Sequence, residues 1–131
     1  MTSGALVLVD TGVWSAFFSK PGSREKEAVD ALLDEDRIAI TGPVLAEVLR
    51  GFRRPDQADW VASRLRLAHY LESTWEDWRN AATLGRDLAA KRHDVPLTDL
   101  IVAALSRRVE ASIFTNDHHF DLIQPLRRYR S

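Results

Sequence analysis

Short apolar runs alternate with longer stretches of helical spacing along the whole chain. Residues 5–9 form a continuous apolar run rich in β-branched side chains, and residues 37–41 and 111–115 are two further predicted strands. A continuous apolar run of this length is typical of a strand buried on both faces of a parallel sheet. The alternation predicts an α/β fold, a three-layer α/β/α sandwich with a central, mostly parallel sheet of four or five strands.

Six helices are expected between these strands. Ser23, Asp56 and Thr98 are the expected N-caps of three of them, because short polar side chains satisfy the free backbone N–H groups of a first turn. Proline and glycine mark several of the boundaries. The helices are expected over residues 14–18, from Ser23 through Leu33, from Pro43 onward, from Asp56 through Ala68, over residues 74–92 and over residues 99–109. A short additional strand is indicated at residues 68–71.

The composition indicates one globular domain over residues 1–131. Hydrophobic residues make up 45% and charged residues 28% of the chain, as in ordinary globular proteins. The net charge of −1 does not itself indicate nucleic-acid binding, although a basic rim can surround an acidic pocket. The absence of cysteine excludes disulfides and thiolate metal sites. The N-terminal apolar run is too short for a signal peptide or a membrane span, so we expect a cytoplasmic location.

Four acidic residues lie beside apolar segments that should pack into one core: Asp10, Glu47, Asp99 and Asp117. Asp10 and Asp117 follow predicted strands, and ligands of parallel sheets bind at the carboxyl ends of the strands. Two carboxylates about 4 Å apart repel by roughly 4 kcal/mol at an effective dielectric constant near 20. A cluster of four therefore either takes up protons or binds a hard cation. Oxygen ligands without cysteine favour Mg²⁺ or Mn²⁺.

Each acid alone also has a structural explanation. Asp10 could be a helix N-cap, Asp99 could be stabilised by the helix dipole in a first turn, and Asp117 could be a turn residue. Glu47 is the hardest to explain in this way, because it lies in an otherwise apolar helical segment. The spacing of the four acids in the sequence does not by itself prove that they converge.

Several polar residues surround the last of these acids. Thr115 and Asn116 could orient it by hydrogen bonds, and Asp121 is interpreted as a helix or turn residue that could support the site from further out. His118 and His119 are expected to face solvent or RNA. Adjacent histidines seldom face the same site, and an oxygen-rich Mg²⁺ site does not favour them.

Four segments together carry a family resemblance: LVDTGVW, VLAEVLRGF, VPLTDLIVAAL and IFTNDHHFD. With these segments in this order, the chain resembles a PIN domain, and more narrowly the toxin component of a VapBC-type toxin–antitoxin pair. The resemblance implies a Mg²⁺- or Mn²⁺-dependent endoribonuclease that acts on single-stranded RNA. It places the family's acidic residues on Asp10, Glu47, Asp99 and Asp117. One departure is Gly12, which stands where a small hydroxyl residue is common.

The expected chemistry is metal-assisted hydrolysis of a phosphodiester bond. Asp10 and Asp99 are the first candidates for metal ligands, and Asp117 and Glu47 would complete the site directly or through water. A basic rim that meets the RNA backbone is assigned from charge alone. Its members are Arg50, Arg53, Arg54, Arg86, Lys91 and Arg92.

The resemblance also implies protein partners. A cognate antitoxin would cover the site, and an Arg or Lys of that partner would replace the cation in the acidic pocket. A homodimer and a toxin–antitoxin hetero-oligomer are expected. An apolar groove for the partner is predicted from the aromatic residues Trp14, Phe17, Phe18, Phe52 and Trp60, although Phe17 and Trp60 could equally fill the core.

Two other classes of protein stay open at this point. One is a Mg²⁺-dependent phosphoryl-transfer or phosphatase α/β domain. Such domains carry paired acids after the first strand or an Asp-x-Asp motif, whereas Asp10-Thr11-Gly12 supplies one acid. The other is a non-catalytic PIN-like binding module, and acids at all four positions count against it.

Overall fold

A four-stranded parallel sheet forms the centre of the protein, in a computed structural model that describes residues 5–131. The strand order is β3-β2-β1-β4, and all three strand pairs are parallel. Leu8 of β1 pairs with Ala39 of β2 on one side and with Ile113 of β4 on the other. The predicted parallel sheet is confirmed, including the weakly indicated strand at residues 68–71. The strands are β1 (Val7–Val9), β2 (Ile38–Ile40), β3 (His69–Tyr70) and β4 (Ser112–Phe114).

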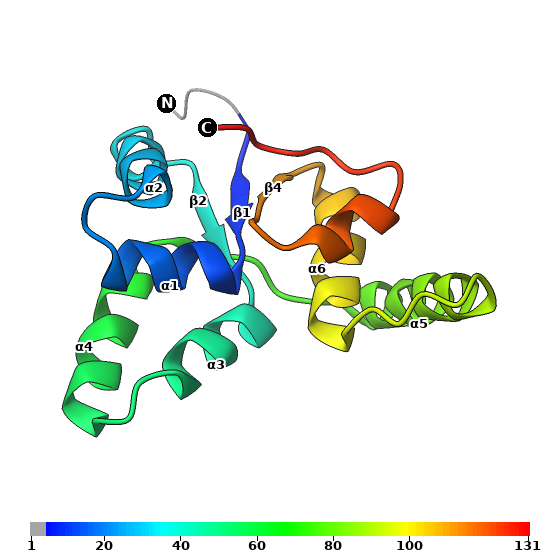
Figure 1. Cartoon of the computed structure of the whole chain (residues 1–131), viewed down its shortest axis with the longest axis horizontal. Coiled ribbons are helices and arrows are strands. Elements are labelled where there is room, and N and C mark those ends of the chain that lie inside the picture. The colour runs from blue at the N-terminus through cyan, green and yellow to red at the C-terminus, as the bar shows by residue number, and fades with distance from the viewer. Residues whose placement is uncertain (1–4) are drawn as a thin grey trace.

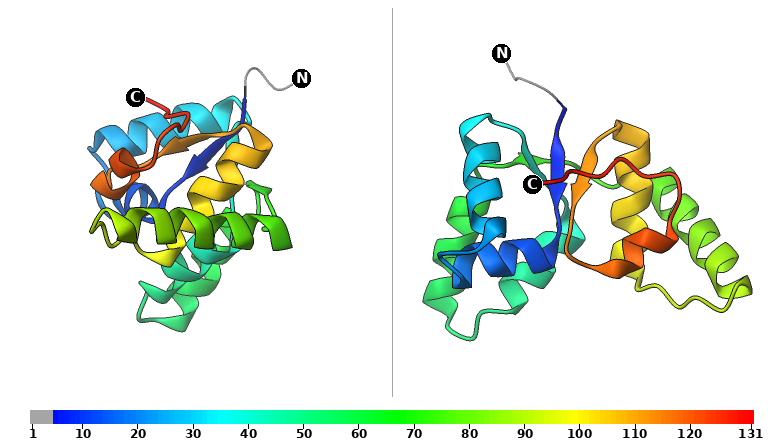
Figure 2. Two further views of the ribbon diagram at one scale, coloured as in Figure 1. Left: turned by 90° about the vertical axis from the view of Figure 1, so that its right-hand side faces the viewer. Right: turned by 45° about the horizontal axis from the view of Figure 1, so that its top comes forward.

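Helices flank this sheet on both sides. Figures 1 and 2 show α1 to α4 on one side of β1 and the pair α5 and α6 on the other. This division follows from right-handed crossovers, because the chain moves from β1 through β2 to β3 in one direction and returns to β4 in the other. The helices are α1 (Thr11–Ser19), α2 (Arg24–Asp34), α3 (Gly42–Arg50), α4 (Pro55–Leu65), α5 (Trp75–Ala90) and α6 (Leu97–Val109), and a 3₁₀-helix, η1, spans His118–Leu122.

The predicted helix caps are partly confirmed. The Ser23 hydroxyl accepts a hydrogen bond from the backbone N–H of Lys26, as expected for an N-cap. The prediction is wrong for Asp56 and Thr98, because α4 begins at Pro55 and α6 begins at Leu97, directly after Pro96. Pro55 is the first residue of α4, where its fixed φ suits a helix start, and Pro96 occupies the N-cap position of α6.

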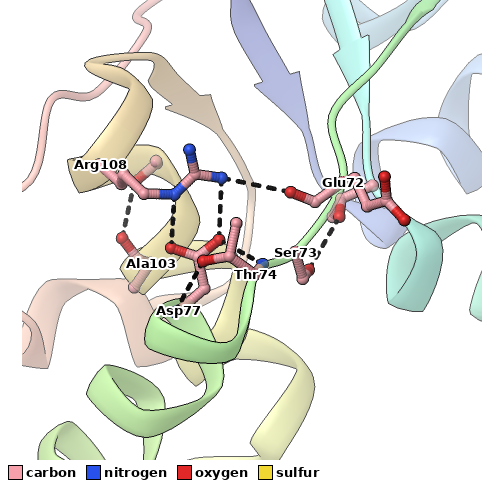
Figure 3. A network of polar contacts seen from close by, with 8 residues as sticks. Glu72, Ser73, Thr74, Asp77, Ala103 and Arg108 are labelled. Carbon is pink, nitrogen blue, oxygen red and sulfur yellow. Dashed lines mark hydrogen bonds and ion pairs between the residues drawn. The ribbon is translucent and has the colours of Figure 1, made fainter.

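A polar clamp joins α5 to α6 (Figure 3). Asp77 is fully buried, and its two carboxylate oxygens accept hydrogen bonds of 2.8 and 2.9 Å from the guanidinium of Arg108. Asp77 also accepts from the backbone N–H of Thr74, while the Thr74 hydroxyl accepts from the backbone N–H of Asp77. This reciprocal pair is a capping box at the start of α5. The clamp therefore fixes α5 against the helix that carries Asp99.

Candidate active site

Asp10 lies at the carboxyl end of β1, where the sheet meets the start of α1. Its backbone N–H donates to the carbonyl of Phe114 on β4, so the ends of the neighbouring strands β1 and β4 are held together. The residue occupies the N-cap position of α1, which is the structural explanation considered from the sequence. Its carboxylate, however, accepts a 2.8 Å hydrogen bond from the Thr115 hydroxyl and is only 4% exposed. The side chain is therefore held at the sheet edge.

Glu47 connects three helices. It projects from α3, and one of its carboxylate oxygens accepts a 2.8 Å hydrogen bond from the hydroxyl of Thr11 on α1. The other oxygen accepts a 3.1 Å hydrogen bond from the hydroxyl of Thr98 on α6. Thr98 thus serves as a partner of Glu47 in place of its predicted capping role. Neither threonine was predicted as a site residue, although each is adjacent in sequence to one of the four acids.

His119 bridges two of the acids. Its Nδ1 atom lies 3.1 Å from Oδ2 of Asp99 and 3.0 Å from Oδ1 of Asp117. Asp117 caps η1 by accepting from the backbone N–H of His119, which brings the imidazole ring back towards the acids. The expectation that both histidines face solvent or RNA is therefore incomplete for His119, which contacts two of the acids while its side chain stays 40% exposed. His118, in contrast, is 99% exposed and pairs with Asp121. The two histidines point in different directions because successive residues of a 3₁₀-helix are about 120° apart.

The acids perturb one another's protonation. Burial raises the pKa of Asp99 to about 7, and the charges of Asp10 and Asp117 add to this effect, while His119 partly offsets it. Burial also raises the pKa of Asp10 above its usual range, although the Thr115 hydrogen bond acts in the opposite direction. For His119, burial lowers the pKa, but the charges of Asp117 and Asp99 outweigh it and leave the pKa raised. Mutual repulsion at this edge is therefore only partly compensated by protein groups.

The donor atoms at this edge suit a divalent cation. One ligand atom each from Asp99, Asp117 and His119 lies within 4.8 Å of the other two. Carboxylate oxygens are the ligands that Mg²⁺ and Mn²⁺ favour, and imidazole is compatible with Mn²⁺ and other transition metals. Asp10 lies outside this compact trio, but its charge is close enough to raise the pKa of Asp99. Its predicted role as a metal ligand stays a prediction.

Residues 115 and 116 support this edge in different ways. Thr115 donates to Asp10 and accepts from the backbone N–H of Asp117, so one hydroxyl connects both strand-end acids. The side-chain amide of Asn116 fills the space that a Cβ atom at Gly12 would need. Glycine at position 12, where a hydroxyl residue is common, therefore leaves room for the Asn116 side chain. Asp121 forms an ion pair of 2.9 Å with Arg128, so its contacts lie towards the C-terminal segment.

The predicted basic rim is divided between two helix ends. All six side chains are exposed, three near the end of α3 and three near the end of α5. Arg54 donates two hydrogen bonds, of 3.1 and 2.6 Å, to the carboxylate of Asp56, which neutralises much of its charge. The assignment of these residues to RNA binding stays a prediction, and it is weakest for Arg54.

Comparisons with known proteins place this geometry in a family. The family model described as "PIN domain" matches residues 7–124. Ribonuclease VapC11 of Mycobacterium tuberculosis is 33% identical over 125 residues, which cover 90% of this chain and 91% of that protein. A VapC ribonuclease of Mycobacterium bovis, Mb1587, matches with the same identity and coverage.

Solved structures share the fold at lower sequence identity. VapBC2 from Rickettsia felis, bound to a DNA fragment from its promoter, superposes with a TM-score of 0.80 at 19% identity, covering 95% of this chain and 97% of that chain. VapBC-1 from nontypeable Haemophilus influenzae gives a TM-score of 0.79 at 18% identity, covering 95% and 96%. With the family model and the curated relatives, these findings show that the chain belongs to the PIN-domain family and, within it, to the VapC ribonucleases.

Proposed function

We propose that the protein is a divalent-metal-dependent endoribonuclease that cleaves single-stranded RNA in the cytoplasm. A cognate antitoxin protein neutralises this ribonuclease. The metal is Mg²⁺ or Mn²⁺, and Asp10, Asp99 and Asp117 hold it, with Glu47 completing the catalytic group. The main support is the only partly compensated negative charge at the carboxyl edge of the sheet, where burial and neighbouring carboxylates raise the pKa of Asp99 to about 7. Such a site favours a cation over a proton once a divalent ion is present.

The side chains of the chain itself prepare the site for this reaction. When bound, a divalent ion supplies positive charge that activates water and offsets the charge developing on the phosphate. Thr115 orients Asp10, and the Asp117 carboxylate is held at the start of η1. Thr11 and Thr98 fix both oxygens of Glu47, which suits a carboxylate that orients a water molecule.

Product chemistry tests the proposed reaction. Metal-activated water leaves a 5′-phosphate and a 3′-hydroxyl, whereas attack by the RNA 2′-hydroxyl leaves a cyclic phosphate. We expect EDTA to abolish cleavage, and Mg²⁺ or Mn²⁺ to restore it. A substrate with hydrogen in place of the 2′-hydroxyl at the cut site should still be cleaved. Activity that persists in EDTA, or complete resistance of this 2′-deoxy substrate, would show that the metal-activated mechanism is wrong.

The antitoxin part of the proposal rests on a groove beside α1 that is lined largely by aromatic side chains. A cavity of about 450 Å³ is lined by the apolar side chains of Phe18, Phe52, Trp60 and Val61 and by the polar residues Asp56 and Gln57, and Trp60 is 53% exposed. Trp14 is buried, so it supports the groove from below rather than lining it. Exposed aromatic residues are common anchors of protein interfaces. The related solved structures named above are VapBC structures.

Co-expression with a small protein encoded beside this chain tests the antitoxin proposal. We expect a tight complex in which cleavage stops, because a partner Arg or Lys would occupy the acidic pocket. Excess Mg²⁺ should then partly restore cleavage by competing for the acids. A chain that is harmless when expressed alone and binds no such partner would contradict the toxin assignment, while leaving the nuclease assignment to the product analysis.

A further inference from the structure

The position of His119 sets it apart from the four acids on which the proposed function rests. Its Nδ1 atom contacts Oδ2 of Asp99 at 3.1 Å and Oδ1 of Asp117 at 3.0 Å. In an octahedral site with bonds of about 2.1 Å, neighbouring ligand atoms lie about 3.0 Å apart. The two measured separations therefore match those between adjacent ligands of a single ion.

We propose that His119 is a metal ligand, so that the site has one nitrogen donor beside its carboxylate oxygens and discriminates in favour of Mn²⁺ over Mg²⁺. This inference deepens the proposed function and rests on it. Imidazole nitrogen raises the affinity for transition metals such as Mn²⁺, whereas Mg²⁺ favours oxygen ligands. The preference would therefore come from this one side chain.

The backbone supports this assignment. Asp117 accepts a 2.9 Å hydrogen bond from the backbone N–H of His119, so the carboxylate and the imidazole are held together at the start of η1. Asp99, the other carboxylate that the imidazole contacts, lies in the first turn of α6. Nδ1 lies within hydrogen-bond distance of both carboxylates, to which it can donate when it carries the proton. With its proton on Nε2, the same atom presents a lone pair to a cation between the two acids.

The neighbouring histidine provides a matched control. His118 is exposed and pairs with Asp121, so His118→Ala removes one imidazole from the same turn without removing a contact of Asp10, Glu47, Asp99 or Asp117. His119→Ala removes the proposed ligand. His119→Asn places an amide oxygen near the position of Nδ1, which should retain Mg²⁺ binding while removing the nitrogen donor. Thermal unfolding of all three variants without metal shows whether each one is folded.

Pulsed electron paramagnetic resonance of bound Mn²⁺ tests the ligand directly. We expect the wild type and His118→Ala to show electron-spin-echo modulation from a coordinated nitrogen, and His119→Ala and His119→Asn to lack it. In titrations of free Mn²⁺ and competing Mg²⁺, His119→Ala should weaken Mn²⁺ binding by about tenfold while changing Mg²⁺ binding much less.

Several results would overturn the inference. Bound Mn²⁺ without nitrogen modulation in the wild type would exclude His119 as a ligand while leaving the proposed function intact. Equal weakening of both ions in His119→Ala would mean that the imidazole positions the carboxylates. Tighter binding in that variant would mean that His119 is an internal counter-ion that the metal displaces. A wild type that binds neither ion would contradict the proposed function as well.

Discussion

At the scale of single residues, the raised pKa of Asp99 shows most clearly how burial and neighbouring carboxylates disfavour negative charge at this edge. It is 6% exposed, and burial together with the charges of Asp10 and Asp117 raises its pKa to about 7. In the unfolded chain an aspartate has a pKa of about 3.9. Between these values the folded state binds more protons than the unfolded state, so raising the pH lowers the free energy of unfolding.

We therefore predict that the metal-free protein loses stability as the pH rises from about 4 towards 7. His119 acts in the same direction, because its raised pKa gives stability below about pH 6.5 that is lost as the pH passes through the folded value. Asp99→Asn should flatten the profile, and Mg²⁺ or Mn²⁺ should stabilise the wild type more at pH 8 than at pH 5. Urea denaturation measures both effects, and parallel profiles for wild type and Asp99→Asn would contradict this account.

The contact between Gly12 and Asn116 gives a second prediction at this scale. A Cβ atom at position 12 would collide with the Asn116 amide, which is exposed and free to rotate away. Gly12→Ser should therefore fold, with a coupling free energy to Asn116→Ala on the order of 0.5–1 kcal/mol. A double-mutant cycle of urea denaturation measures this coupling. Additive effects of the two substitutions would mean that the side chain of Asn116 is not held in the space beside Gly12.

At the scale of elements, a polar clamp joins α5 to α6, the helix that carries Asp99. Burial raises the pKa of Asp77, but hydrogen bonds from Arg108 and Thr74 outweigh it and leave the pKa below its usual range. The stabilisation is therefore present above the unfolded pKa near 4 and is lost as the pH falls through the folded value. The sequence Thr74-x-x-Asp77 resembles a capping box, but nothing in the sequence identified Arg108, which lies 31 positions further along the chain, as its partner.

Asp77→Ala should lower the free energy of unfolding by roughly 2–3 kcal/mol, because it removes the capping box and leaves Arg108 without its carboxylate. Asp87→Ala is a matched control, since Asp87 is exposed on the same helix. We expect the control to change stability by less than about 0.5 kcal/mol. Chemical denaturation at pH 7 measures both variants, and equal values for the two would show that the clamp contributes little.

At the scale of the whole molecule, the alternation of apolar runs and helical segments was enough to predict the fold. The convergence of Asp10 and Asp117 follows from that prediction, because both residues come after parallel strands at neighbouring positions in one sheet. The contacts of His119 and of the threonines that bind Glu47 could not be predicted. They depend on how a 3₁₀ turn and three helices meet, and sequence spacing carries no signal for such long-range contacts. The two wrong caps arose because proline determined the helix start.

The central claim is that the acids at the carboxyl edge of the sheet bind the divalent ion that RNA cleavage requires. Direct Mn²⁺ binding to Asp99→Asn, measured beside cleavage of the same RNA, tests this claim most directly. Asp94→Asn is the control, because Asp94 is an exposed acid five positions earlier in the chain. We predict that Asp99→Asn is folded, binds Mn²⁺ at least about tenfold more weakly and loses most cleavage, while Asp94→Asn matches the wild type. Wild-type Mn²⁺ affinity and cleavage in Asp99→Asn would contradict the account.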